Sequence, residues 1–281
     1  MSNTDKYIPL LNDLAELYSA KKQEEKNVRI KRENDFSALC DELCLLYDEY
    51  LKSLLDNQIS PFLRKYSFLN TPSLLSVASK EEKETYHSMY LHYVFSEKTA
   101  IGSSVLFDFC KIIGCETEKM QTIKQKSYEV RAEFPTGKQR KRSISQRRFD
   151  LLVIDNENQW LVLIENKINS NVGLRNGHQL KAYQDFCNLY GFSEISNKTY
   201  VLLSYKENNR KEADAFGWIF VDYYTLFSLL LKYAEKDGVI RDYLKTLYSL
   251  LFSDVQISYD YNKGSLYRCW LFCKRIILNG R

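Results

Sequence analysis

Two carboxylates and one amine lie in a short stretch of this chain, at a spacing that could create a metal-binding centre. Asp150 belongs to an apolar run at residues 148–155, and Glu165 and Lys167 end a second run at residues 159–167. A polar turn separates the runs, and this pattern predicts a β-hairpin. The three side chains would then lie near the ends of paired strands.

The register of the hairpin decides whether these side chains meet. If the turn is centred on Glu157 and Asn158, Asp150 lies opposite Glu165. Opposed side chains on antiparallel strands stand roughly 5 Å apart. Lys167 follows Glu165 by two residues, so both project from the same face. A different turn length would break this register.

Facing carboxylates in an apolar hairpin require compensation. Like charges opposite each other destabilise a sheet, and burial makes them more costly. A simple ion pair between Lys167 and one carboxylate would leave the other uncompensated. A hard divalent cation such as Mg²⁺ would compensate both, since it prefers oxygen ligands. The pattern therefore predicts a metal site at Asp150 and Glu165.

The net charge of +4 is small, so local clusters of charge matter more than the total. One basic cluster lies directly before Asp150. Its members are Lys138, Arg140, Lys141, Arg142 and Arg148. Two interpretations stay open: a solvated loop, or an arm that contacts phosphates.

Composition narrows the class of protein. With 44% hydrophobic and 27% charged residues, the chain has the composition of an ordinary globular protein. Seven cysteines, an odd number without a CxxC pair, favour reduced thiols in the cytoplasm over disulfides or zinc. No signal sequence and no membrane span are expected. Three histidines make a histidine-based metal site or a Ser-His-Asp triad an unfavoured alternative.

The elements that must position the site follow from apolar periodicity. Residues 5–58 read as helices, solvent-exposed or hairpin-like in the charged part at 21–33. A longer helix is predicted at 87–114 and a strand at 127–134. After the hairpin we expect a helix at 177–190, strands at 200–204 and 218–221, and helices at 223–233, 239–252 and 265–278. Asp222 is the expected N-cap of the helix at 223.

The motifs together resemble the PD-(D/E)xK nuclease superfamily. Asp150 is followed by the triplet Glu165-Asn166-Lys167, and Gln179 and Tyr183 form the QxxxY motif of a poorly characterised bacterial branch. Phe149 stands where the motif has Pro, a position that supplies no metal ligand. The resemblance covers roughly residues 87–221.

This resemblance implies an α/β fold. We expect a restriction-endonuclease-like core of order αβββαβ, with a mixed central sheet flanked by helices and helical additions at both ends. The implied domains are an N-terminal helical extension at 1–86, the nuclease core at 87–222 and C-terminal helices at 223–281.

It also implies roles for the metal-site residues. Mg²⁺, for which Mn²⁺ would substitute, is expected on Asp150, Glu165 and the backbone carbonyl of Asn166. A glutamate on the first core helix often completes the site, and Glu97 is the candidate, with an exposed ion pair as its alternative. Lys167 would orient or activate the attacking water.

Two helical residues and one strand residue are further candidates. Gln179 and Tyr183 lie one helical turn apart and share a face. They would contact the scissile phosphate or hold the catalytic lysine, or Tyr183 would pack in the core. Glu133 is a weaker metal-site candidate.

The implied function is metal-dependent hydrolysis of phosphodiester bonds, with DNA endonuclease activity favoured and RNA left open. Host defence or mobile-element biology would be its setting. Two alternatives remain. One is a nucleic-acid-binding or regulatory module with a vestigial core. The other is a helical protein-interaction subunit, in which residues 5–58 bind a second copy or another protein.

Overall fold

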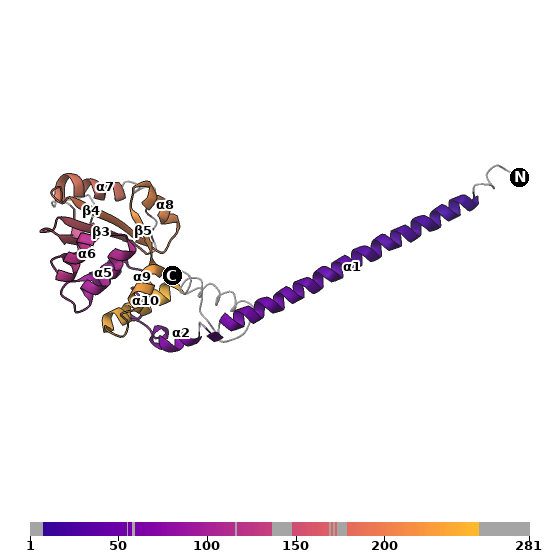
Figure 1. Ribbon diagram of the computed structural model, residues 1–281, viewed down its shortest axis with the longest axis horizontal. Helices are drawn as coiled ribbons and strands as arrows, with labels where there is room; N and C mark the ends of the chain where they lie inside the picture. The colour runs from indigo at the N-terminus through magenta and orange to yellow at the C-terminus, as the bar shows by residue number, and fades with distance from the viewer. Residues whose placement is uncertain are drawn as a thin grey trace. The chain divides into compact units, whose positions relative to one another are not determined.

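The computed structural model describes residues 8–54, 56–57, 60–115, 117–136, 148–168, 170, 172 and 179–252. The chain divides into two compact units, residues 1–57 and 58–281. Each unit is a structure in its own right, with the sheet and the site residues in the second (Figure 1).

The first unit contains one uninterrupted helix, α1 (Ile8–Leu54), of 47 residues. The charged part at 21–33 continues this helix and is exposed, so the exposed alternative is confirmed and a hairpin there is wrong. Residues with good helix propensity, such as Glu, Lys and Arg, dominate that part and keep the backbone helical. An ion pair between Arg29 and Glu33, with Nε and Oε1 2.9 Å apart, spans one turn.

The second unit combines short helices with one sheet. Its helices are α2 (Ser60–Lys65), η2 (Ser67–Asn70), α3 (Leu74–Val77), α4 (Glu84–Phe95), α5 (Gly102–Ile112), α6 (Thr117–Gln125), α7 (Gln179–Phe186), η3 (Cys187–Gly191), α8 (Asn208–Ala215), α9 (Tyr223–Leu231) and α10 (Gly238–Leu251). Its strands are β1 (Glu129–Pro135), β2 (Arg148–Asp155), β3 (Trp160–Lys167), β4 (Asn197–Ser204) and β5 (Ile219–Asp222).

The sheet is mixed and has the order β1-β2-β3-β4-β5. The first three strands pair antiparallel, and β3, β4 and β5 pair parallel. Helices α7 and α8 provide the crossovers that parallel pairing requires. The expected restriction-endonuclease-like α/β fold is confirmed, with β5 extending the αβββαβ core by one strand.

The hairpin has the predicted register. Leu151 pairs with Ile164, and Asp155 pairs with Trp160 across a four-residue turn. The Asp155 carboxylate closes this turn, because it accepts hydrogen bonds from the backbone N–H of Asn158 at 3.0 Å and from its Nδ2 at 2.8 Å. An aspartate bonded to the backbone a few residues onward is a local turn device, so the register follows from nearby sequence.

Helices cover both faces of the sheet (Figure 1). One face packs against α7, η3 and α8 through a buried cluster that includes Leu163, Leu202, Leu180 and Trp218. Helices α4 and α9 pack on the other face, α4 against β1, β2 and β3. All eight residues of β3 are buried, which explains why its sequence is a nearly continuous apolar run.

The predicted helix at 87–114 is wrong as a single element, because α4 and α5 are separate. The backbone of Ser96 turns to an extended conformation after α4. In the segment between the helices, side-chain hydroxyls accept hydrogen bonds from backbone N–H groups. The Ser96 hydroxyl accepts from Lys98 N–H at 3.2 Å, and the Thr99 hydroxyl accepts from Gly102 N–H at 2.9 Å. Such side chains compete with helical bonding. The predicted stop at Gly114 is confirmed by its positive φ of 67°.

Helix α6 was not predicted, and its polar sequence depends on contacts with the sheet. Lys119 donates to the hydroxyl of Thr199 at 2.9 Å, and the indole N–H of Trp160 donates to Thr122 at 2.9 Å. Both partners lie at the ends of strands distant in sequence. The helix is therefore selected by tertiary packing rather than by its own periodicity.

The remaining sequence predictions agree with the described elements. The helix predicted at 177–190 corresponds to α7 and η3, and the last two strands and two helices lie where expected. The helix predicted at 265–278 lies outside the described residues. None of the helices in the described ranges is long and apolar enough to cross a membrane.

The proposed domain limits of 1–86, 87–222 and 223–281 remain predictions. The second compact unit begins at residue 58 and includes α9 and α10 together with the sheet. Helix α4 begins at Glu84, three residues before the proposed core.

Asp222 caps α9, because its Oδ1 accepts a hydrogen bond from Thr225 N–H at 2.7 Å. We expect Asp222→Ala to lower the free energy of unfolding by about 1 kcal/mol, the usual value of such a cap. Asp222→Asn is the matched control, since asparagine also caps helices, and it should lose much less. Urea denaturation measures both, and equal losses would contradict the capping role.

Candidate active site

The candidate site lies at the C-terminal end of β3, on the face covered by α7. Glu165 and Lys167 are 1% and 7% exposed, and both lie within the last three residues of β3. Lys167 Nζ lies 2.5 Å from Glu165 Oε1. The predicted convergence of a carboxylate and an ammonium on one face is therefore present.

Asp150 enters the site from β2. Continuing the observed hairpin register by one residue beyond Leu151 and Ile164 places Asp150 opposite Glu165. Its Oδ2 accepts a hydrogen bond from the backbone N–H of Asn166 at 2.7 Å. This bond fixes the carboxylate across the two strands.

Helix α7 adds Gln179 and Tyr183 to the same cluster. Gln179 Nε2 donates to Glu165 Oε1 at 2.7 Å and to the hydroxyl of Tyr183 at 3.0 Å. Tyr183 in turn donates to the backbone carbonyl of Arg148 at 2.7 Å. Tyr183 is also a member of the buried core, so both sequence interpretations of it hold at once. Its ring packs and its hydroxyl anchors the start of β2.

A third acidic residue, Glu84, reaches the site from the first turn of α4. Its Oε1 accepts from Ile168 N–H at 3.0 Å and from the hydroxyl of Ser170 at 2.7 Å, and its Oε2 lies 3.7 Å from Lys167 Nζ. The sequence analysis missed Glu84 because it began the helix at His87. The available signal for Glu84 was its position as an acidic residue in the first turn of a helix. Many helices have such a residue, so this signal does not point to a site.

Asn166 fixes α4 against the end of β3. Its side chain projects from the face opposite to Glu165, where Nδ2 donates to the carbonyl of Glu84 at 3.2 Å. Its Oδ1 accepts a hydrogen bond from the buried hydroxyl of Tyr223 on α9. The residue between the two charged members of the motif thus links the site to both helices of the opposite layer.

The structure does not bring Glu97 into this cluster. Glu97 follows the C-terminal end of α4, whereas Glu84 begins the helix, and the 12 residues between those ends span about 18 Å. The Glu97 carboxylate lies 3.9 Å from Lys98 Nζ instead, but its side chain is only 17% exposed, so the expected exposed ion pair is present only in part. Glu84 of α4, and not Glu97, lies beside Lys167.

Glu133 lies on β1, directly opposite Asp150 of β2. The register of β1 with β2 pairs Ala132 with Leu151 and Phe134 with Phe149, which leaves Glu133 at the level of Asp150. Its φ is 53°, a left-handed conformation that is rare outside glycine. The Glu133 carboxylate lies 4.0 Å from a guanidinium nitrogen of Arg148.

The electrostatics of the cluster favour an additional cation. The pKa of Asp150 is raised well above its usual value, mainly by burial and secondly by repulsion from Glu165. Burial also raises the pKa of Glu165, against the opposing attraction of Lys167. Burial lowers the pKa of Lys167, but Glu165, Asp150 and Glu84 outweigh it and the net pKa is raised. One ammonium therefore faces three carboxylates.

The donor set fits a hard divalent cation. Among the described residues, no hydrogen-bond partner reaches the buried Oε2 of Glu165, so a strong oxygen ligand is left free beside Asp150. The described residues contain no group of three or more Asp, Glu, His or Cys side chains placed to hold a metal. Lys167 contacts Glu84 Oε2 and Glu165 Oε1, which leaves the Asp150 carboxylate and Oε2 of Glu165 for the ion. Two carboxylates suit Mg²⁺, since it keeps several of its waters.

The basic cluster is only partly described. Lys138, Arg140, Lys141 and Arg142 lie outside the described residues. Arg148 begins β2, two residues before Asp150, and its side chain is half exposed. Its place beside the carboxylates agrees with a position next to bound phosphate.

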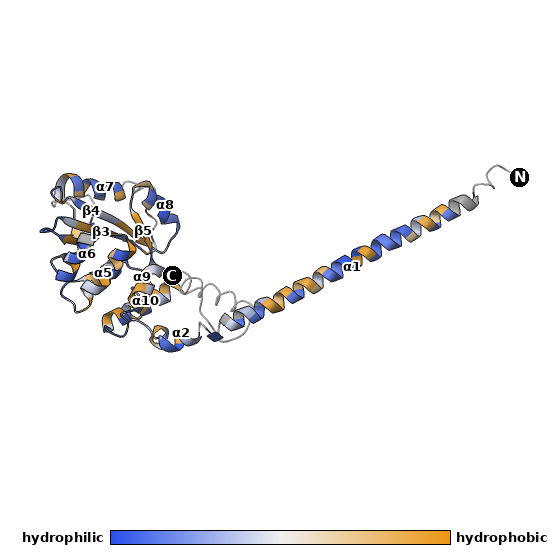
Figure 2. Cartoon of the chain, in the orientation of Figure 1, coloured by the Kyte–Doolittle hydropathy of each residue, from blue (hydrophilic) through white to orange (hydrophobic). Residues whose placement is uncertain are grey.

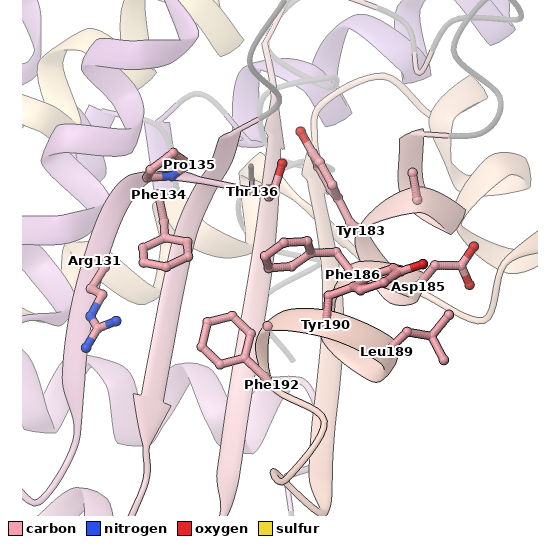
Figure 3. Close-up of a pocket in the computed structure, with 12 residues that line it drawn as sticks. Arg131, Phe134, Pro135, Thr136, Tyr183, Asp185, Phe186, Leu189, Tyr190 and Phe192 are labelled. Carbon is pink, nitrogen blue, oxygen red and sulfur yellow. The ribbon is translucent and has the colours of Figure 1, made fainter. Parts of the chain in front are cut away.

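A groove of about 1120 Å³ adjoins the site along α7 and η3 (Figure 3). Figure 3 shows aromatic rings from both walls directed into it. Its lining includes Phe134 and Phe192 on one side and Tyr183, Phe186 and Tyr190 on the other. Tyr183 belongs to both the groove and the carboxylate cluster, so the two features are continuous.

Metal binding can be tested without any assumption about the reaction. Mg²⁺ or Mn²⁺ at about 100 times its dissociation constant should stabilise the fold by about 2.7 kcal/mol, since it binds the folded state. Asp150→Asn should abolish this stabilisation and stay folded, because it removes one ligand charge and relieves repulsion with Glu165. Differential scanning calorimetry with and without the metal measures both effects.

Asp185→Asn is the control for this experiment, because Asp185 lies on α7 and pairs with Lys181 at the surface, away from the carboxylate cluster. It should keep the full metal response. A response of equal size in the two variants would show that the metal binds elsewhere.

The comparison with known families agrees with this geometry. The family model of the PD-(D/E)XK nuclease superfamily matches residues 72–254. This range includes every described residue of the candidate site and all five strands. No curated protein and no solved structure matches the chain.

Proposed function

Because the chain belongs to the PD-(D/E)XK nuclease superfamily, we propose that it is a metal-dependent nuclease that cleaves phosphodiester bonds within DNA. One observation carries the proposal: Asp150, Glu165 and Lys167 meet at the end of β3, with one buried carboxylate oxygen left free. The QxxxY residues Gln179 and Tyr183 support this centre from α7.

The metal would be held by Asp150, Glu165 and the backbone carbonyl of Asn166. When bound, Mg²⁺, or Mn²⁺ in its place, supplies a Lewis acid that stabilises charge on the phosphate and lowers the pKa of water. Against the effect of burial, the neighbouring carboxylates raise the pKa of Lys167, which suits an ammonium that orients the attacking water and stabilises negative charge.

Two residues hold this machinery in place. Gln179 fixes Oε1 of Glu165, which directs the other carboxylate oxygen away from α7. Glu84 lies beside Lys167 and limits where its ammonium can move. We assign Glu84, in place of Glu97, as the glutamate from the first core helix that completes the site.

The substrate side of the proposal rests on charge next to the site. Arg148 and the cluster Lys138, Arg140, Lys141 and Arg142 precede Asp150 in the sequence, which suits contact with the phosphates that flank the scissile bond. DNA is the favoured substrate, and cleavage of RNA is the alternative that an assay distinguishes. A cytoplasmic role in host defence or mobile-element biology follows from the resemblance alone.

Cleavage of supercoiled plasmid, linear duplex, single-stranded DNA and RNA tests the proposal directly. We expect plasmid cleavage with Mg²⁺ or Mn²⁺ and none with EDTA. Asp150→Asn and Glu165→Gln should each lower the rate at least 100-fold, because each removes a ligand charge. Glu84→Gln should lower the rate and Glu97→Gln should not, since only Glu84 lies beside Lys167.

The outcomes of this assay separate the alternatives. Tight DNA binding without turnover in any metal would favour the binding module with a vestigial core. Cleavage of RNA alone would change the proposed substrate from DNA to RNA and leave the assignment of the site residues unchanged. Equal loss of activity in Glu84→Gln and Glu97→Gln would refute the assignment of Glu84.

The basic cluster has its own test. Replacing Lys138, Arg140, Lys141 and Arg142 by Gln should weaken DNA binding to a similar extent for all sequences, because phosphate contacts carry no sequence information. Each lost contact should reduce the log–log slope of affinity against salt by about 0.9. Fluorescence anisotropy with Asp150→Asn protein measures binding without cleavage. An unchanged slope would restore the interpretation of a solvated loop.

A further inference from the structure

The surface of α1 is the largest feature that the candidate nuclease does not use. Nine large apolar side chains on it are each between 52% and 70% exposed. Six of them share one heptad frame: Tyr18, Phe36, Leu39, Leu43, Leu46 and Tyr50. Figure 2 shows apolar residues toward both ends of α1 and a hydrophilic stretch between them. Helices in water are stabilised mainly by packing of an apolar face, so a helix of 47 residues requires a partner.

The apolar residues follow the spacing of a coiled coil. Phe36, Leu39, Leu43, Leu46 and Tyr50 are separated alternately by three and four residues. This is the spacing of the a and d positions of a heptad, which face a partner helix. The partner is therefore another long helix rather than a flat surface.

The same heptad frame extends toward the N-terminus through a charged centre. Counting back from Phe36, the a and d positions are Arg32, Arg29, Glu25 and Lys22, after which Tyr18 and Ala15 are apolar again. The seam is thus apolar at both ends and charged in the middle. A partner must match this order of apolar, charged and apolar segments.

We propose that α1 pairs with α1 of a second copy of this chain in the antiparallel direction. This arrangement places Ala15 of one copy against Leu39 of the other, and Tyr18 against Phe36. The two apolar ends then cover each other, and a twofold axis crosses the helices in the charged centre. Each contact is made twice, as such symmetry requires.

Charge selects this direction over the parallel one. In the antiparallel pair Glu25 faces Arg29 in two layers, and Lys21 lies beside Asp35 at the flank of the seam. The other two charged layers, of Lys22 against Arg32, bring like charges together. In a parallel pair each seam position faces its own copy, so all four charged layers hold like charges. Repulsion of this kind sets the partner and direction in coiled coils.

The mass of the full chain in solution tests the association. Light scattering after size exclusion should give twice the chain mass of 33.2 kDa. Leu39→Glu should weaken association at least 10-fold, because it buries a charge against Ala15. The matched control is Leu45→Glu: Leu45 is 66% exposed but lies outside the seam, so this variant should remain dimeric. Circular dichroism checks that both variants are folded.

Cysteine crosslinking tests the direction. In chains with Cys40 and Cys44 replaced by Ser, one copy carries Tyr18→Cys and a differently tagged copy carries Phe36→Cys. Oxidation should join the two different copies, whereas a parallel pair would join Tyr18→Cys to itself. A monomer at high concentration, or a dimer unaffected by Leu39→Glu, would overturn the proposal. Preferential joining of identical copies would overturn the direction. None of these results depends on nuclease activity.

Discussion

The buried ammonium of Lys167 is the interaction on which the candidate site depends. It lies against Glu165 and near Glu84, at the point where β3 ends and α4 begins. A buried charge persists only when it is paired, so the lysine and the carboxylates require one another. Three carboxylates nevertheless surround one ammonium, and the proposed divalent cation would balance the remaining negative charge.

The architecture serves to bring these charges together from four segments. The hairpin aligns Asp150 with Glu165, α7 supplies Gln179 and Tyr183, and the first turn of α4 supplies Glu84. Successive side chains of β3 project from opposite faces of the sheet. Glu165 and Lys167 face the site, and Asn166 between them binds the opposite layer through Glu84 and Tyr223. A change in either layer therefore reaches the site.

The two units of the chain present different kinds of surface. The unit from residue 58 buries an apolar core around a sheet, and two of its buried charged residues, Glu165 and Lys167, belong to the site. In α1 large apolar residues remain exposed in a regular pattern. Membership of the PD-(D/E)XK nuclease superfamily accounts for the first surface, and the family match begins only at residue 72. The proposed pairing of α1 with a second copy would cover the second surface.

The sequence by itself determined the features that depend on neighbouring residues. A short polar turn between two apolar runs set the register that places Asp150 opposite Glu165, and Asp222 set the start of α9. Tertiary structure decided the rest. Glu84, like many acidic residues, would be equally stable in water at a helix start, and only the packing of α4 against the end of β3 brings it to Lys167. Glu97 has the same chemistry and lies at the wrong end of the same helix. Residue type can suggest a ligand, but long-range packing selects which carboxylate is buried beside the lysine.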